Sequence, residues 1–162
     1  MSTEAHATSQ ISPLAAIDIS SRGTKTIIGE YSVIDAFVRI KHVGGSGHIR
    51  IGKNCHINSG CVLYSGNGIE LGDDVLIGPN CSLVPVNHAT HRMDIPIRLQ
   101  GFAQSKGGIT IESNVWLGAA VTVLDGVTIC SGCIVAANAM VNTNLEVPGI
   151  YGGIPAKLIR VR

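Results

Sequence analysis

The sequence has little charge, few aromatic residues and no long apolar run. Charged residues make up 14 % and the formal net charge is +1, which excludes the broad basic surface that nucleic-acid-binding proteins present to phosphates. Aromatic residues amount to 4 %, so the core must consist mainly of aliphatic side chains. No stretch approaches the roughly 18 apolar residues of a membrane span, and the first twenty residues contain no Lys or Arg, unlike a signal peptide. We expect a cytoplasmic protein.

Aliphatic residues recur every six positions along most of the chain. The longest unbroken series is Ile111, Leu117, Val123, Ile129, Val135, Val141 and Val147. Shorter series run from Ile28 to Ile40, from Ile51 to Leu63 and from Leu71 to Leu83. Six is a multiple of the strand period of two and not of the helical 3.6, so helix is excluded. Six-residue repeats are typical of a β-solenoid, in which each repeat is a short strand plus a corner.

Three such repeats complete one triangular coil of about 18 residues. Ile111, Ile129 and Val147 should therefore stack above one another, and about five coils fit the chain. Because the repeats start at Ile28, we assign residues 1–27 to an N-terminal polar segment. Residues 28–162 are assigned to an all-β solenoid domain with a basic C-terminal tail.

The repeat is interrupted in three places. After Ile40, Leu63 and Leu83 the next aliphatic position of the repeat comes 11, 8 and 28 residues later instead of six. Each interruption follows the third repeat of a coil, so all three insertions should emerge along one edge of the prism. A long insertion inside a compact domain is usually functional. The last one, near residues 84–108, carries His88 and His91.

The chain has five cysteines, of which Cys130 and Cys133 have the C-x-x-C spacing of a redox or zinc half-site. The repeat offers a simpler interpretation. Cys133 falls on the small inward position of its repeat, as do Cys55, Cys61 and Cys81, and a cysteine there behaves as a compact hydrophobic residue. Cys130 follows an aliphatic position, so the spacing is a by-product of the register. We favour this packing role over a metal site or a disulfide.

Four sequence features together resemble a known family. They are the repeats of the form [LIV]-G-x-x-[small]-x, the loop N-H-x-x-H-x-x-D from Asn87, V-W-L-G at 115–118 and the ending G-I-P-A-K-L-I-R at 153–160. Over residues 28–162 the chain is similar to the hexapeptide-repeat acetyltransferases, and most to the galactoside, maltose and polysaccharide O-acetyltransferases. The resemblance implies a single-stranded left-handed parallel β-helix. It also implies a homotrimer whose active sites lie between subunits.

The resemblance implies that acetyl-CoA and a hydroxyl of a sugar or polysaccharide precursor meet in each site. His88 matches the family's catalytic histidine and Asn58 its acceptor-binding asparagine, while His91 is a candidate acceptor contact or a structural residue. The positions that match cofactor contacts are Trp116, Gly118, Ala119, Ala137, Thr143, Lys157 and Arg160. At Thr143 relatives commonly carry a lysine, so that contact is altered here.

These residue types suit acetyl transfer chemically. A hydroxyl is a poor nucleophile at neutral pH, and a histidine base is typically worth about 10²–10⁴ in rate. We therefore expect His88 to remove the acceptor's proton during direct attack on acetyl-CoA in a ternary complex. Backbone N–H groups near Gly118 and Ala119 are candidate donors to the oxyanion. Asp94 could orient an imidazole or cap the turn before Pro96.

Three alternatives use the same scaffold. A sugar N-acetyltransferase needs similar base chemistry, so the loop does not separate transfer to nitrogen from transfer to oxygen. A γ-type zinc carbonic anhydrase needs three histidine ligands. Its relatives place two of them five residues apart, whereas His88 and His91 are three apart and His56 is the obvious third. A non-catalytic solenoid is the third alternative. We expect a transferase without a metal.

Overall fold

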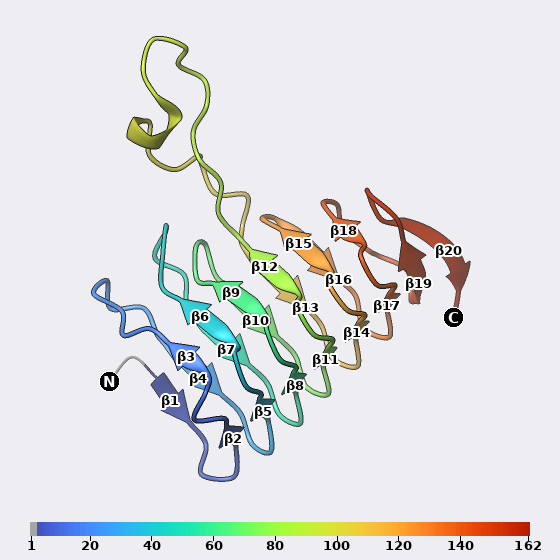
Figure 1. The fold of residues 1–162 in the computed structure, drawn as a ribbon. Helices are drawn as coiled ribbons and strands as arrows, with labels where there is room; N and C mark the ends of the chain where they lie inside the picture. Colours follow the sequence, from blue (N-terminus) through green and yellow to red (C-terminus); the bar gives the residue numbers. More distant parts are fainter. Residues whose placement is uncertain (1–2) are drawn as a thin grey trace.

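The computed structural model describes residues 3–162. Within that range the strands form three sheets that make the sides of a prism (Figure 1). The first sheet contains β1 (Thr3–Ala5), β4 (Thr26–Ile28), β7 (Ile49–Ile51), β10 (Ile69–Leu71), β13 (Ile109–Ile111) and β16 (Val127–Ile129). The second contains β2 (Gln10–Ile11), β5 (Val33–Ile34), β8 (His56–Ile57), β11 (Leu76–Ile77), β14 (Trp116–Leu117), β17 (Ile134–Val135), β19 (Gly149–Gly152) and β20 (Lys157–Val161). The third contains β3 (Ala16–Ile17), β6 (Arg39–Lys41), β9 (Val62–Tyr64), β12 (Ser82–Val84), β15 (Thr122–Leu124) and β18 (Met140–Val141).

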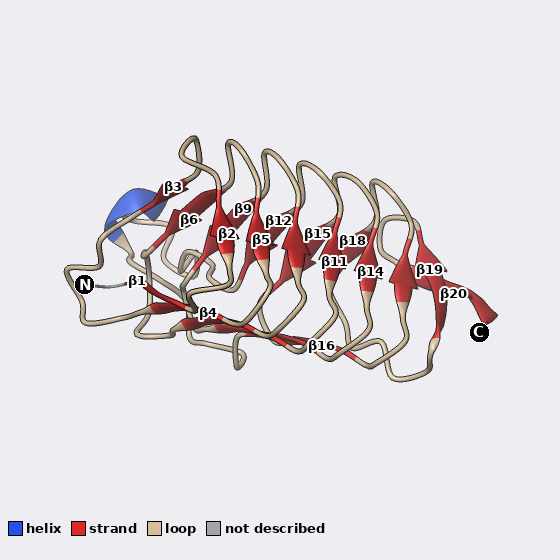
Figure 2. Cartoon of the chain, turned by 90° about the horizontal axis from the view of Figure 1, so that it is seen from below, coloured by secondary structure: helices blue, strands red, loops and turns tan. Residues whose placement is uncertain are grey.

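From β1 to β18 each strand is followed by a strand of the next sheet, and strands of successive coils pair in parallel. The chain is therefore a parallel β-helix, as expected. Helical structure in the described residues is confined to one short 3-10 turn, η1 (Ile97–Leu99) (Figure 2). Among residues 3–162, no helix has the length and apolar character needed to cross a membrane.

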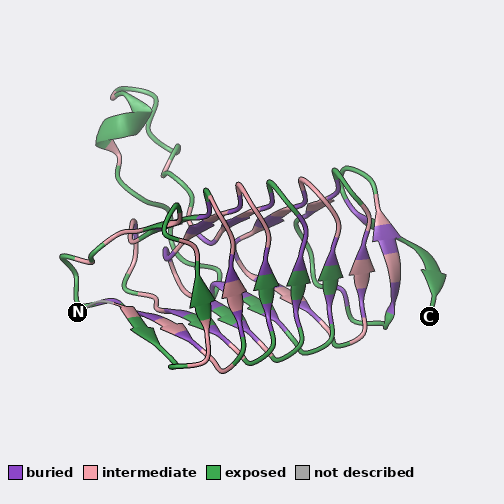
Figure 3. Cartoon of the chain, turned by 60° about the horizontal axis from the view of Figure 1, so that its bottom comes forward, coloured by how far each residue is buried: buried purple, intermediate pink, exposed green. Residues whose placement is uncertain are grey.

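The six-residue period places the aliphatic side chains in the prism's interior. In the second sheet Ile57 pairs with Ile77, Ile77 with Leu117, and Leu117 with Val135, and all four side chains are fully buried. Figure 3 shows buried residues recurring at the same place in successive coils. Because aliphatic side chains of similar size stack on one another, successive coils have nearly the same cross-section. The interior can therefore pack as densely as a typical protein core.

The cysteines follow the predicted packing role. Cys55, Cys61, Cys81 and Cys133 are buried in the core. Cys130 lies partly exposed with its Sγ 3.4 Å from that of Cys133.

The predicted stack was wrong at its last member. Ile111 pairs with Ile129, but Ile129 then bridges to Leu145, which is buried, whereas Val147 is 43 % exposed. The repeat contracts here, because Leu145 follows the buried Val141 after four residues instead of six. From Gly149 the chain forms β19, which pairs in parallel with β17 and antiparallel with β20.

The β-helix also begins earlier than residue 28. Strands β1, β2 and β3 pair with β4, β5 and β6 of the next coil, so residues 3–17 form a coil of their own. In the described part of the chain the first and third sheets each have six strands, where about five coils were expected. This coil closes one end of the prism, and its inward positions are incompletely covered; Ile11 is 37 % exposed. Its hydrophobic signal is correspondingly weak.

The three insertions emerge along one edge, as predicted. Each one connects a strand of the third sheet to a strand of the first: β6 to β7, β9 to β10 and β12 to β13. The connection over residues 85–108, here called the His88 loop, projects far beyond the prism (Figure 1).

Candidate active site

The two legs of the His88 loop pair with each other near the prism. Ala89 N–H donates to the Gly101 carbonyl at 3.1 Å, and Ala103 N–H donates to the Asn87 carbonyl at 2.8 Å. His88 and Phe102 face each other in this antiparallel bridge. The loop therefore holds His88 in a defined position, although its side chain is exposed.

Two contacts orient the imidazole of His88. The ring stacks on Phe102 with centroids 5.2 Å apart and an angle of 28° between the planes. Its Nδ1 lies 3.2 Å from the Gly101 carbonyl oxygen. A carbonyl only accepts hydrogen bonds, so Nδ1 must carry the hydrogen when this bond forms. The neutral ring then has its lone pair on Nε2, the tautomer that a general base requires.

The His88 loop has a closed tip. The Gln100 side chain accepts from Arg92 N–H at 3.0 Å and donates to the carbonyls of Arg92 and Ile95 at 2.6 and 3.1 Å. Asp94 pairs with the Arg92 guanidinium, and this hydrogen bond lowers the pKa of the Asp94 carboxyl below its usual value. The carboxylate of Asp94 therefore stabilises the tip of the loop through Arg92 and does not orient an imidazole.

A buried carboxylate fixes the point where the loop returns. Asp125, 6 % exposed, accepts from Gly108 N–H at 3.0 Å, from Lys106 N–H at 2.9 Å and from the Asn67 amide at 3.1 Å. Sequence reasoning missed Asp125, because Asp followed by Gly is an ordinary turn signal. Its role depends on contacts with residues distant in the sequence.

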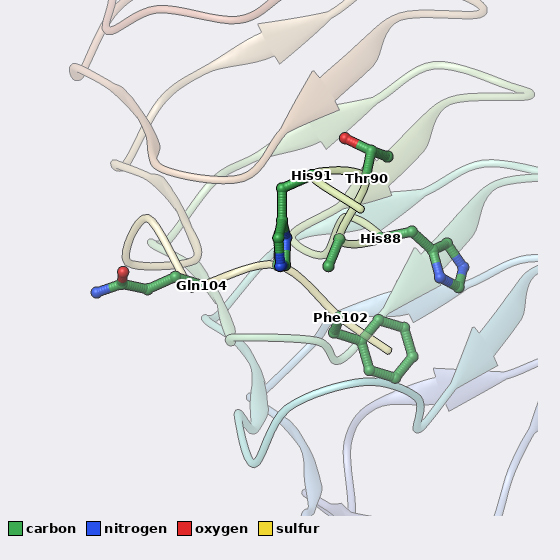
Figure 4. Close-up of a pocket in the computed structure, with 7 residues that line it drawn as sticks. His88, Thr90, His91, Phe102 and Gln104 are labelled. Carbon is green, nitrogen blue, oxygen red and sulfur yellow. The ribbon is translucent and has the colours of Figure 1, made fainter. Parts of the chain in front are cut away.

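Two pockets share the His88 and Phe102 side chains. One, of about 420 Å³, is lined in addition by Ala89, Thr90, His91, Ala103 and Gln104 (Figure 4). The other, of about 330 Å³, is lined in addition by Val43, Tyr64, Val84, Val86 and Asn87. The imidazole thus stands between two pockets, of which the second is the more apolar. The structure brings His91 together with His88, and it adds Phe102, which the sequence analysis did not identify.

The other predicted site residues lie elsewhere on the chain. Asn58 follows β8, and its amide donates to the Ile77 carbonyl at 2.7 Å. Trp116, 49 % exposed, points outward from β14 between Leu76 and Ile134. It borders a separate pocket of about 230 Å³ that also contains Arg162. His56 faces outward from β8. Neither His88 pocket contains these side chains.

The predicted cofactor residues occupy the C-terminal coils. Ala137 and Thr143 are exposed there, and Lys157 and Arg160 are exposed on β20. Gly118 has a packing role, because a Cβ on it would lie 2.7 Å from the Ala137 nitrogen. Its N–H donates to the Val135 carbonyl at 2.7 Å, so the prediction that this N–H is available to an oxyanion was wrong. Ala119 keeps that candidate role.

Among residues 3–162, no group of three or more His, Cys, Asp or Glu side chains is arranged to hold a metal ion.

Comparison with known proteins matches the repeats to two family models. Residues 108–143 match the bacterial transferase hexapeptide model, and residues 48–85 match the hexapeptide repeat of succinyl-transferase. Galactoside O-acetyltransferase of Escherichia coli is 32 % identical over 113 residues, which are 70 % of this chain and 54 % of that protein. The enzyme of the same name from Lactococcus lactis is 32 % identical over 116 residues, covering 72 % and 54 %. The chain spans about half the length of these curated relatives.

Solved structures agree with the fold. AntD, an N-acyltransferase from Bacillus cereus solved with dTDP and 3-hydroxybutyryl-CoA, superposes with a TM-score of 0.80 at 26 % identity. The match covers 99 % of this chain and 82 % of AntD. A variant of AntD has been solved with dTDP-4-amino-4,6-dideoxyglucose and coenzyme A.

The coils, the repeats and the projecting histidine loop define a left-handed β-helix of the transferase type. The chain carries hexapeptide repeats of the bacterial transferase type and is similar to acetyltransferases built on such repeats.

Proposed function

We propose that the protein transfers an acetyl group from acetyl-CoA to a hydroxyl of a sugar or polysaccharide precursor, with His88 as the general base. The observation that carries this proposal is the setting of His88. Its Nδ1 faces the Gly101 carbonyl, its ring stacks on Phe102, and both of its sides adjoin a pocket. The galactoside O-acetyltransferases among the relatives support a sugar hydroxyl as the acceptor.

The geometry suggests how His88 handles the proton. Acetyl-CoA would supply the acyl group as a thioester. Nε2 of His88 would take the proton of the acceptor O–H while the oxygen attacks the carbonyl carbon. The imidazolium would keep its Nδ1–H on the Gly101 carbonyl and return the other proton to the sulfur as the C–S bond breaks. His88 ends neutral, and the products are an ester and a free thiol.

A sugar amine is the second candidate acceptor. The specific observation in its favour is AntD, an N-acyltransferase that matches nearly the whole chain. A neutral amine would use the same base and the same pocket, so both acceptors are compatible with His88.

We further propose that the site is shared between copies of the chain in a cytoplasmic homotrimer. The His88 pockets and the pocket at Trp116 are separate within one chain. A site that needs both would be completed when the His88 loop of one subunit meets the C-terminal coils of the next. There Trp116 and Ala137 would flank the pantetheine arm, while Lys157 and Arg160 would pair with the phosphates of acetyl-CoA. Asn58 would contact the acceptor.

The first test is titration of acetyl-CoA into the purified protein by calorimetry. Desulfo-CoA serves as an unreactive ligand, and the zinc content of the same sample is measured. Saturable micromolar binding supports the transferase and justifies screening sugar hydroxyls and amines by thiol release. Stoichiometric zinc without binding of acetyl-CoA would overturn the proposal in favour of a metal site.

A further inference from the structure

The apolar pocket beside His88 lies between the third sheet, the connection after β6 and the His88 loop. Val84 ends β12 and Tyr64 ends β9. Leu63 and Leu83 pair in register and are fully buried. Tyr64 and Val84 follow them, so both side chains point outward from the third sheet. Val43, Val86 and Phe102 complete the apolar walls.

The polar groups of this pocket are few. The residues that line it include no Asp, Glu, Lys or Arg, and its polar side chains are Tyr64, Asn87 and His88. Its volume of about 330 Å³ is at the lower end of the range for small-molecule sites, which typically combine apolar walls with a few orienting polar groups. The walls therefore suit a carbon-rich surface rather than a fully hydroxylated one.

The walls are held in place by the prism. The Ser65 hydroxyl accepts from Val43 N–H at 3.2 Å, and Gly66 N–H donates to the Val43 carbonyl at 2.9 Å. Val86 packs closely on Gly44, because a Cβ added to Gly44 would lie 2.7 Å from the Cγ2 of Val86. A Cβ on Gly66 would lie 2.5 Å from the Pro85 carbonyl oxygen. The pocket is thus formed before any ligand arrives, which reduces the entropic cost of binding.

The pocket lies on the acceptor side of the proposed reaction. The predicted cofactor residues follow the His88 loop in the sequence, on β14, β20 and the corners of the later coils. The apolar walls outside the loop precede it in the sequence: Val43 lies in the connection after β6, Tyr64 on β9 and Val84 on β12. In a shared site the next subunit brings acetyl-CoA to the outer side of His88. The space between His88 and its own coils remains for the acceptor.

We infer that this pocket selects a 6-deoxy sugar as the acceptor, with the C6 methyl group against Val84 and Val86; the inference rests on the proposed function. Tyr64 and Asn87 would supply hydrogen bonds to the remaining ring oxygens. An added hydroxyl in a hydrophobic pocket typically costs about 10²-fold in kcat/KM. We expect a preference of roughly 10- to 100-fold for the methyl-bearing sugar.

The test compares acceptors that differ only at C6. D-Fucose and D-galactose differ by a methyl against a hydroxymethyl group, and each is supplied as the methyl glycoside and as the nucleoside-diphosphate sugar. The 4-amino derivatives of both sugars cover transfer to nitrogen. The kcat/KM ratio is measured by thiol release for the wild type, for Val84→Thr and for Val62→Thr. Val62 is a matched control, since it points outward from the same sheet and does not line the pocket.

The expected result is a preference for the 6-deoxy member that Val84→Thr reduces by about threefold or more and Val62→Thr leaves unchanged. Equal turnover of both members overturns the inference while the proposed function stands. Acetyl-CoA binding without turnover of any panel sugar also overturns it. If Val84→Thr changes the oligomer mass but not the kcat/KM ratio between the two sugars, the pocket is a subunit contact and the inference is also overturned. Failure to bind acetyl-CoA at all would remove the proposed function itself.

Discussion

At the scale of single residues, the orientation of His88 depends on partners that come from the opposite leg of its own loop. The sequence identified the histidine because it interrupts an otherwise regular repeat. It did not identify Phe102 or the Gly101 carbonyl, because their contact with His88 depends on how the two legs pair. Nothing in the spacing of the loop residues specifies that register.

Asp125 offers a test of how the loop is anchored. Asp125→Ala leaves three donors without their partner, and we expect a loss of about 1–3 kcal/mol in the free energy of unfolding, measured in urea. Glu70→Ala, which removes an exposed ion pair with Arg50, should cost less than about 1 kcal/mol. Equal losses for the two variants would contradict the anchoring role.

His42 should make stability depend on pH. Burial lowers its pKa below the usual value, which is about 6.5, and its two ring nitrogens contact the hydroxyls of Thr24 and Thr26 at 2.8 and 3.1 Å. Below that pH the unfolded state binds a proton more readily than the folded state, so stability falls as the pH drops.

We therefore expect the Tm to rise between pH 5.5 and 7.5, and His42→Asn to weaken this rise. His56→Asn, at an exposed position of β8, should retain it. An unchanged pH dependence in His42→Asn would show that other groups cause it.

At the scale of elements, the six-residue period was sufficient to predict the strands, the inward positions and the edge from which the insertions emerge. It failed at both ends of the prism. The first coil leaves its inward residues partly exposed, and the last one contracts so that Leu145 replaces Val147 in the core. At these ends a repeat has a neighbour on one side only, so packing no longer enforces the period.

The His88 loop should be separable from the fold. Replacing residues 87–106 by a short Gly-Ser linker removes none of the paired strands of the prism, and loop length has only a small effect on closure entropy. We expect a protein that unfolds cooperatively with unchanged far-ultraviolet circular dichroism and no acetyl transfer. A collapse of the β-helix would show that the loop is part of the folding unit.

At the scale of the whole molecule, one sequence could not show where His88 meets the predicted cofactor residues. The structure places Trp116 in a pocket separate from the two that His88 lines. In the proposed shared site, contacts between copies would bring the two together. Family resemblance supplied the proposal of a trimer; the spacing of the repeats did not.

Mixing two inactive variants tests the shared site. His88→Ala and the double variant Lys157→Ala/Arg160→Ala should each be inactive alone. Co-refolded in equal amounts, they should regain about one quarter of the sites, the fraction with an intact loop opposite an intact tail in a head-to-tail ring. An absence of rescue in mixed trimers would place each complete site within one chain.

The most direct test of the account is the thiol release rate of His88→Ala with acetyl-CoA and an accepted sugar. We predict a kcat lower by about 10²–10⁴ with unchanged affinity for acetyl-CoA, while His6→Ala, in the first coil, keeps the wild-type rate. Wild-type turnover in His88→Ala would contradict the assignment of the base and with it the proposed mechanism.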